Sequence, residues 1–437
     1  MRRVFLDRGR LIDRLEMAKV IRKRKITSRE ELEKLDKNEL IDRLLSLEAH
    51  NQQLKNVILK SEKGKDSPVS KEIPPGQRKF DFTKCHKRHI FMKLYYLGWD
   101  YQGFATQEDS PMTIEHHLFS ALTRACLIAD RESSNYHRCG RTDKGVSAFS
   151  QVISIDIRSK LEPSEQDKLD QEIKYCKLLN KILPKNIRII SWSPADPEIS
   201  ARFDCKCRSY KYFFPRGNLD IDAMNQAAKY IIGSHDFRNL CKMDVANGVT
   251  SFIRNVKDAS VTCIDSGEKK VSGYDMCELS IKSNAFLWHQ IRCIMGILLL
   301  IGERNEKPEV IKELLDVEKC QRKPQYCLGH YIPLNLFSVE YDNTNWYIDT
   351  EEFEKVIKDL QEEWGEAEIK ATMMKSMLKD LTSSLGTDEE TVCQQSGWLL
   401  QGVKSKIYRP LMERDTCESL EERIDHYTKK QRLEKTS

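Results

Sequence analysis

The sequence contains no apolar stretch long enough to cross a membrane. Its longest apolar run, Ile294–Ile301, is far shorter than the roughly 20 residues that a membrane-spanning helix needs. Hydrophobic residues still make up 40% of the chain, which is enough to bury a core. We therefore expect a folded protein without a membrane partner. Its 437 residues predict about three folding units.

The chain also lacks the usual patterns for binding metals and cofactors. Its 14 cysteines form no regular C-x-x-C pairs and follow no signal-peptide pattern, which predicts reduced thiols in a nuclear or cytosolic protein. There is no glycine-rich nucleotide-binding loop. Two small groups contain zinc-binding residue types but have no second ligand pair at zinc-finger spacing: Cys85 with His86 and His89, and Cys205 with Cys207. We expect neither a metal nor a cofactor.

Charge is distributed unevenly along the chain, although the net charge is only +5. Residues 1–30 carry eleven Lys or Arg and four Asp or Glu, whereas residues 346–400 carry five Lys and thirteen Asp or Glu. A basic leading segment suits a polyanionic partner, but it is equally typical of a solvated terminus. Arg22–Lys25 resembles a short nuclear localisation signal, so we expect the protein in the nucleus, the cytoplasm or both.

Composition divides the chain into five predicted parts. Residues 1–60 are a basic segment followed by a helical pattern, and residues 61–80, rich in Gly, Ser and Pro, are a flexible linker. The globular body consists of two halves, 81–200 and 201–345. Residues 346–437 form a helical extension.

Hydrophobic periodicity predicts alternating strands and helices in each half of the body. In the first half we expect strands at 89–96, 151–157 and 187–192, with helices at 114–125 and closing at 178–184. In the second half we expect strands at 210–214, 277–282 and 336–341, a helix at 222–232, and a long helix from about 285 to 301.

Residues 40–58 carry a heptad pattern. Leu and Ile recur at alternating spacings of four and three, interrupted by one Asn, at Leu40, Leu44, Leu47, Asn51, Leu54 and Ile58. This is the core seam of a short coiled coil, in which a lone Asn commonly specifies a two-stranded parallel register. The alternative is a single amphipathic helix that packs on the body.

The most unusual stretch for chemistry is Tyr136–Ala148. It places Arg138, Arg141 and Lys144 around one carboxylate, that of Asp143. Neighbouring cations lower the pKa of a carboxylate, which keeps it ionised for use as a nucleophile or base. The same cations can hold phosphates. Taken by itself, such a run is more often an ordinary charged turn.

The full run resembles the G-R-T-D-x-G-V-x-A signature of the TruA family of tRNA pseudouridine synthases. It matches at every fixed position, and Ser147 stands where the family usually has His. Five further segments resemble the family in the same order: Tyr95–Phe104, Leu179–Pro184, Ser200–Tyr212, Gly233–Phe237 and Asn284–Gly296. Six ordered matches across the body make chance an inadequate explanation.

The resemblance implies roles for four residues. Asp143 corresponds to the catalytic carboxylate, and Arg141 to an arginine that helps displace the target nucleotide. Tyr210 corresponds to a tyrosine that packs against the target base, and Arg292 to an arginine that pairs with the catalytic carboxylate. Without the resemblance, Tyr210 reads as a core aromatic, Arg292 as a buried structural ion pair and Arg141 as a solvated loop charge.

The resemblance also implies an α+β fold, the pseudouridine synthase fold. It has two ferredoxin-like halves, a joined mixed sheet and a central cleft, here with an N-terminal helix or coiled coil and a C-terminal helical extension. The implied partners are tRNA and a second copy of the chain, as a homodimer, and no cofactor is needed. Whether Asp143 attacks the sugar or removes its C2′ proton stays open.

Within the family, the chain is most similar to the eukaryotic branch that modifies tRNA nucleotides 38 and 39. The supporting segments are Asn135–Ala148, His235–Val249 and the stretch from Gly402 to Met412. Two other functions remain open. One is the same chemistry at other positions of tRNA or in other RNAs, and the other is a non-catalytic tRNA-binding or chaperone role.

Overall fold

The computed structural model describes most of the chain beyond residue 79. The described residues are 80–107, 110–245, 249, 251–264, 272–387, 396–402 and 407–436. They belong to one compact unit that begins at Phe80. The predictions for the basic segment 1–30, for the heptad seam 40–58 and, except for Phe80, for the linker 61–80 lie outside these residues. None of the described helices is both long and apolar enough to span a membrane.

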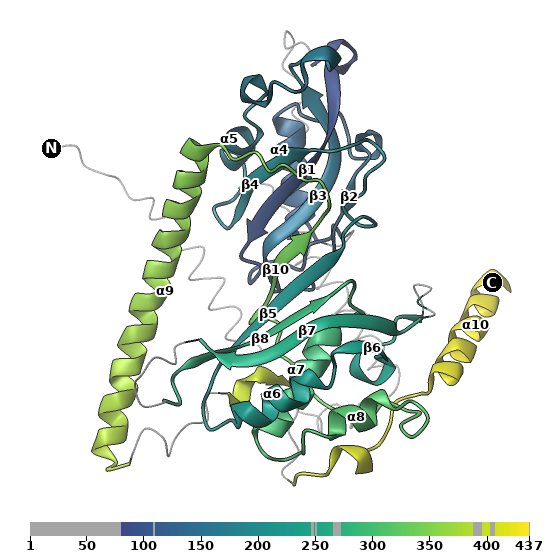
Figure 1. The fold of residues 1–437 in the computed structure, drawn as a ribbon, viewed down its shortest axis with the longest axis vertical. Helices are drawn as coiled ribbons and strands as arrows, with labels where there is room; N and C mark the ends of the chain where they lie inside the picture. The colour runs from purple at the N-terminus through teal and green to yellow at the C-terminus, as the bar shows by residue number, and fades with distance from the viewer. Residues whose placement is uncertain are drawn as a thin grey trace, which may run out of the picture. The chain divides into compact units, whose positions relative to one another are not determined.

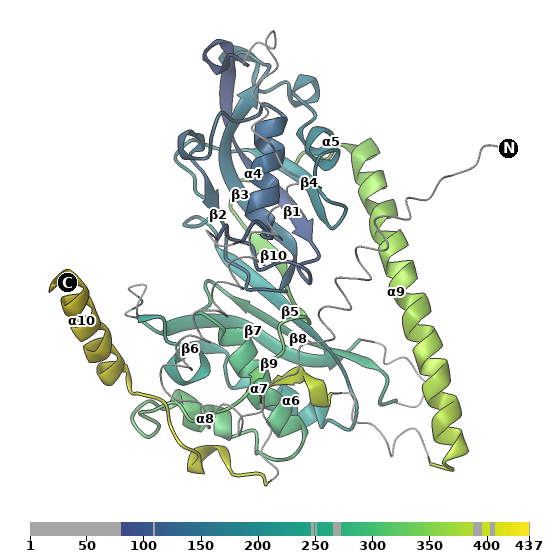
Figure 2. The same ribbon diagram turned by 180° about the vertical axis from the view of Figure 1, so that it is seen from behind.

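The first half of the body is built on three long antiparallel strands. Strand β1 (His86–Tyr96) pairs with β3 (Ser147–Ser159) on one side and with β4 (Ile187–Pro194) on the other. The short strand β2 (His137–Arg138) pairs with β3. Helices α4 (Ile114–Arg124) and α5 (Tyr175–Asn180) complete this half, and α4 lies in front of the sheet in the view of Figure 2.

The second half also combines antiparallel strands with helices. It contains β5 (Cys207–Pro215), β6 (Gly233–Asp236), β7 (Ile253–Cys263) and β8 (Met276–Ser283). Helices α6 (Ile221–Lys229), α7 (Gln290–Gly302) and α8 (Val310–Leu315) accompany them. Every residue of α7 is buried, and apart from Gln290 and Arg292 the helix is apolar on all sides, as a buried helix should be.

Strand β10 (Leu334–Glu340) joins the two halves into one mixed sheet. It pairs in parallel with β3 and antiparallel with β5. The strand order is β4-β1-β3-β10-β5-β8-β7-β6, with β2 beside β3 (Figure 1). A single hydrophobic core runs through both halves behind this sheet. The predicted α+β class with a large mixed sheet is confirmed.

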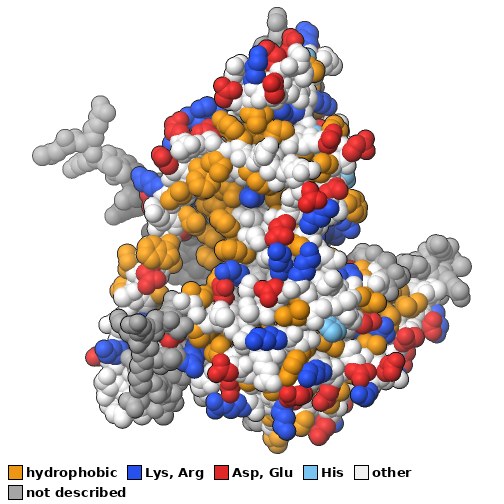
Figure 3. All heavy atoms as spheres, in the orientation of Figure 1, with side chains coloured by type: hydrophobic (Ala, Val, Ile, Leu, Met, Phe, Trp, Pro, Cys, Tyr) orange, Lys and Arg blue, Asp and Glu red, His pale blue; other side chains and the backbone are white. Residues whose placement is uncertain are grey.

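The face of the sheet opposite α4 carries exposed aromatic side chains. Figure 3 shows hydrophobic side chains gathered on this face, over the upper part of the sheet in that view. Among the exposed residues of this sheet, Phe149 of β3 and Phe337 of β10 lie with their ring centroids 5.6 Å apart. Side chains alternate between the faces of a strand, so these two point away from their buried neighbours Ala148 and Leu336.

The C-terminal extension contains two helices and one strand of a small ladder. Helix α9 (Thr350–Ser384) occupies the region predicted to be helical and packs Phe353, Val356 and Leu360 against β1 and β4. Strands β9 (Leu328–Gly329) and β11 (Leu400–Gln401) form a separate two-stranded ladder. Helix α10 (Leu420–Thr436) ends the described chain.

Three predicted helix boundaries are wrong, and the smallest difference is in α6, which was expected to reach residue 232 but ends at Lys229. The helix expected from about residue 285 begins at Gln290, because His289 has a left-handed backbone with φ of 57° that a continuous α-helix excludes. The helix expected to close near Pro184 ends at Asn180 and continues only as a turn. The residue before a proline disfavours helical geometry, so the chain leaves the helix early.

Candidate active site

Asp143 lies on a tight loop between β2 and β3. Gly145 forms the turn with φ of +74°, and a Cβ there would come within 2.2 Å of the Tyr331 ring. The N–H of Gly145 donates to the carbonyl of Tyr101 (3.0 Å), and the N–H of Val146 donates to that of Asp143 (3.1 Å). Backbone bonds and close packing therefore fix where the carboxylate stands.

Buried polar contacts fix β2, the strand that leads into this loop. The carboxylate of Glu115 is fully buried and forms ion pairs with Arg138 and Arg131, and the Tyr136 hydroxyl donates to it at 2.6 Å. Burial would raise the pKa of Glu115, but the hydrogen bonds from Tyr136 and the Thr106 N–H, together with the Arg138 charge, lower it below its ordinary value. Glu115 thus stays ionised and anchors β2.

A single guanidinium ties the loop to the second half. Arg208 of β5 donates to the carbonyl of Cys139 through Nε (3.3 Å) and Nη2 (2.8 Å). It also donates to the carbonyl of Arg202 (3.1 Å) and, through Nη1, to that of Asn284 (2.6 Å). One side chain therefore links the start of the catalytic loop, the segment before β5 and the approach to α7.

The side chain nearest to the Asp143 carboxylate is a histidine. His289, at the N-terminus of α7, places Nε2 at 3.2 Å from Oδ2 of Asp143. Its Nδ1 is buried without a partner among the described residues. With a proton on Nε2 the imidazole donates to Asp143, and without that proton Nε2 can accept from a cation instead.

Arg292 approaches Asp143 through this histidine rather than directly. Its Nη1 lies 3.3 Å from Nε2 of His289, and its Nε donates to the carbonyl of Gly329 at 2.9 Å. Its Nη2 donates to the side-chain oxygen of Gln401. Burial lowers the pKa of Arg292, while the Asp143 carboxylate opposes this shift.

Among the described residues, Arg292 and Asp143 form no ion pair with each other, and both groups lie next to Nε2 of His289. The left-handed backbone of His289, just before α7, sets the direction of its imidazole. Asp143 and Arg292 still belong to one cluster, as predicted.

Tyr210 stands on β5 near the same carboxylate. It is 9% exposed, and its ring lies edge-on to Phe286 with centroids 5.2 Å apart. Burial raises the pKa of Tyr210, and the charges of neighbouring groups, including Asp143, add to this shift. The phenol therefore stays neutral and can donate a proton to a hydrogen bond.

Arg141 is exposed on the same loop, two residues before Asp143. Partial burial and the like charges of Arg138 and Arg202 lower its pKa, although an arginine remains charged in any ordinary buffer. The three cations form a positive rim beside the loop, which suits a phosphate-bearing ligand.

This arrangement offers an accessible carboxylate supported from both halves. The side chain of Asp143 is 32% exposed, whereas that of His289 is only 13% exposed. A ligand can therefore reach Asp143, while the less exposed His289 holds the orientation of the carboxylate. Such a carboxylate can act as a nucleophile or as a base.

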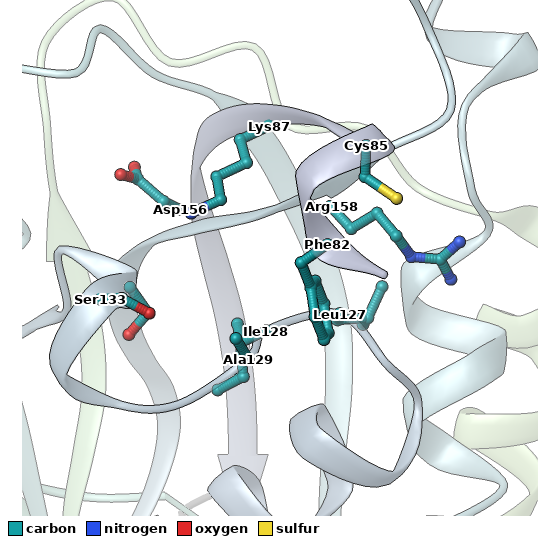
Figure 4. Close-up of a pocket in the computed structure, with 10 residues that line it drawn as sticks. Phe82, Cys85, Lys87, Leu127, Ile128, Ala129, Ser133, Asp156 and Arg158 are labelled. Atoms are coloured by element: carbon teal, nitrogen blue, oxygen red, sulfur yellow. The ribbon is translucent and has the colours of Figure 1, made fainter. Parts of the chain in front are cut away.

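Neither a metal site nor the most evident cavity coincides with this cluster. The described residues contain no group of His, Cys, Asp or Glu placed to hold a metal ion. The cavity in Figure 4 lies in the first half, between the chain near Phe82 and strand β3, with Ile128 and Arg158 in its lining. None of the four predicted site residues lines it.

The sequence reasoning missed three residues of the cluster. His289 lies three positions before Arg292, a spacing that places two side chains on one helical face. Arg208 lies two positions before Tyr210, on the same face of β5. Gln401 lies 109 positions from Arg292, and no sequence pattern connects them.

Comparison with known proteins decides the family. The profile described as tRNA pseudouridine synthase matches residues 227–342. A mouse protein named tRNA pseudouridine(38/39) synthase is 43% identical over 439 residues, covering 93% of this chain and 90% of the relative. The chain belongs to the TruA family of tRNA pseudouridine synthases. Within that family, a Saccharomyces cerevisiae protein with the same name as the mouse one is 38% identical and covers 74% of each chain.

More distant members of the TruA family are also similar. The tRNA pseudouridine synthase A of Methanosarcina mazei is 28% identical over 263 residues, covering 60% of this chain and 87% of the relative. The chain is thus an isomerase of this family, and its substrate class is tRNA.

Replacing Asp143 by Asn should abolish pseudouridine formation. Asn is nearly isosteric but can act neither as nucleophile nor as base, so we expect the single-turnover rate to fall by roughly 10⁴-fold or more. The melting temperature and the Kd for tRNA should change little. The control is Asp258→Asn, on the exposed surface of β7. An Asp143→Asn enzyme that keeps substantial activity would remove Asp143 from the catalytic role.

Proposed function

We propose that the protein converts uridine to pseudouridine at positions 38 and 39 of tRNA, in the anticodon stem-loop. The observation that carries this is the accessible Asp143 carboxylate, held from both halves of a chain that belongs to the family. The relatives named for positions 38 and 39 align over nearly the whole chain, which supports the choice of nucleotides.

The reaction needs no redox partner and no group donor. The bond from N1 of uracil to C1′ breaks, the base turns, and C5 forms a new bond to C1′. The proton that leaves C5 is balanced by one gained at N1. Every atom of the product therefore comes from the substrate and water, which agrees with the absence of a nucleotide-binding motif in the sequence.

The four residues take complementary roles in this proposal. Arg141, at the exposed rim, helps displace the target nucleotide, at a cost of a few kcal/mol for leaving its stack. Stacking on the Tyr210 ring returns about 1–3 kcal/mol. Arg292 supplies positive charge near Asp143 as negative charge moves during bond cleavage. Asp143 acts on the ribose, either at C1′ or at the C2′ proton.

The wider architecture follows the same family plan. We assign residues 81–200 and 201–345 to two ferredoxin-like halves with the substrate cleft between them, followed by the extension 346–437. The matching antiparallel strands of the halves, with helices on one face, support this division. The basic run Arg22–Lys25 supports a nuclear location as well as a cytoplasmic one.

Pseudouridine mapping tests the proposed function. Purified protein should modify U38 and U39 in a tRNA transcript, and replacing either uridine by cytidine should remove only that signal. Because the chemistry uses only side chains, chelator treatment of tRNA folded beforehand in a separate step should leave the rate unchanged. Modification confined to other nucleotides, or a strict requirement for an added metal, would contradict the proposal.

We further propose that the protein works as a homodimer joined through α9. Apolar residues recur along this helix at spacings of four and three, which is the seam of a coiled coil: Phe353, Ile357, Leu360, Trp364, Ala367, Ala371, Met374, Leu378, Leu381 and Leu385. The first part of the seam packs on the body. Beyond it, the large seam residues from Trp364 to Leu385 are 44–75% exposed.

A second copy of α9 is the occupant that this stripe fits. A two-fold interface presents the same patch on both partners, and a heptad seam is self-complementary in this way. The stripe is also larger than the scattered apolar residues that a monomer normally exposes.

Charged substitutions on the seam should separate the copies. We expect the wild type to show the mass of two chains in solution and the double variant Met374→Glu/Leu381→Glu to show the mass of one, because two buried carboxylates would face two more across the seam. Ile369→Glu, exposed on the opposite side of α9, is the control and should stay dimeric. A monomeric wild type, or a double variant that remains dimeric, would exclude this interface.

A further inference from the structure

The guanidinium of Arg292 is held by two neutral acceptors. Arg292 is 6% exposed, its Nε donates to the carbonyl of Gly329 at 2.9 Å, and its Nη2 donates to the side-chain oxygen of Gln401. A guanidinium is a rigid plane, so two fixed acceptors on one side set the direction of the remaining donors. Here Nη1 points to His289, beside Asp143.

Both acceptors belong to the same small ladder. Gly329 lies on β9 and Gln401 on β11, and these strands pair with Leu400 opposite Gly329 and Gln401 opposite Leu328. The N–H of His330 extends the ladder by donating to the carbonyl of Leu399 at 2.6 Å. A displacement of β11 would therefore move Gln401 and, through the ladder, Gly329, the two acceptors that hold the Arg292 guanidinium.

The ladder is fixed against α7, the helix that carries Arg292. A Cβ on Gly296 would lie 2.3 Å from the carbonyl of Cys327, so only glycine allows the chain before β9 to cross the helix at this distance. On the β11 side, Leu399 and Leu400 are buried in the main core. Farther along, the N–H of Leu411 donates to the Glu306 carboxylate at 2.6 Å, just beyond the end of α7. The extension is thus anchored before and after the ladder.

We propose that Gln401, in the C-terminal extension, is a positioning residue of the active site that orients Arg292 toward Asp143 and the target nucleotide. The inference rests on the proposed function, because Arg292 supports catalysis only if the protein carries out that reaction. Gln401 lies outside residues 227–342, which match the family profile. The extension therefore contributes to the catalytic centre itself, in addition to any contact with tRNA.

A neutral amide suits this position better than a carboxylate. The amide oxygen fixes the guanidinium but leaves its positive charge available to Asp143 and to the RNA. A carboxylate at position 401 would hold Arg292 more strongly and would cancel part of that charge. The two kinds of acceptor should therefore support the fold equally well but support catalysis differently.

Two substitutions at Gln401 test this role. Gln401→Met keeps the length of the side chain but removes the acceptor, and its single-turnover rate on saturating tRNA should fall roughly tenfold or more, the scale of a lost hydrogen bond to a charged group. Gln401→Glu keeps the acceptor and should also lose at least about tenfold in rate, by weakening the field of Arg292 at Asp143. The Kd for tRNA should stay within about twofold of the wild type in both variants, since the contact is made inside the protein.

The control is Gln361→Met, exposed on α9, which should match the wild type. A merely structural Gln401 would give a Gln401→Glu enzyme with normal melting temperature and normal rate, and that result would overturn the inference. A Gln401→Met enzyme at the wild-type rate would overturn it as well. If the wild type formed no pseudouridine, the proposed function would fail first, so the two failures are distinguishable.

Discussion

The active site depends on one half-buried cation, the guanidinium of Arg208. Its donors meet three backbone carbonyls, those of Cys139, Arg202 and Asn284, which belong to segments far apart in the sequence. The Cys139 carbonyl begins the loop that carries Asp143, and Asn284 begins the segment that ends in His289. Among the described residues, the contact between His289 and Asp143 is the other direct link that we find between these two segments. A planar, five-donor group is the side chain best suited to such a junction.

The same arrangement explains why the site needs both halves of the body. Asp143 comes from a loop of the first half, whereas Tyr210, His289 and Arg292 come from the second. Strand β10 joins the halves by pairing with β3 on one edge and β5 on the other, so Ala148, just after the catalytic loop, and Tyr210 both lie opposite Leu336. The ladder of β9 and β11 adds a third support behind Arg292. Catalytic geometry is thus a property of the joined sheet and not of either half.

Local sequence patterns predicted many of the strands and the catalytic carboxylate. The elements that they missed have physical causes. Strands with clean alternation, such as β1 and β3, were found from sequence, and the glycine-rich run identified Asp143. Strand β7 was missed because its register shifts between Val256 and Asp258, which breaks the two-residue period of its buried side chains. The start of α7 was placed too early because no sequence signal predicts the left-handed backbone conformation of His289. Gln401 could not be predicted, since its contact with Arg292 exists only after the ladder folds.

The most direct test of this account is the single-turnover rate of an Arg208→Lys enzyme on saturating tRNA. Lysine keeps the charge, but its point-like ammonium cannot hold three carbonyls in one plane. If Arg208 sets the spacing of the catalytic loop and the His289 segment, the rate should fall by roughly 10²-fold, as misplacements of about 1 Å do in enzymes, while the protein stays folded. A folded Arg208→Lys enzyme that works at the wild-type rate would contradict the central claim.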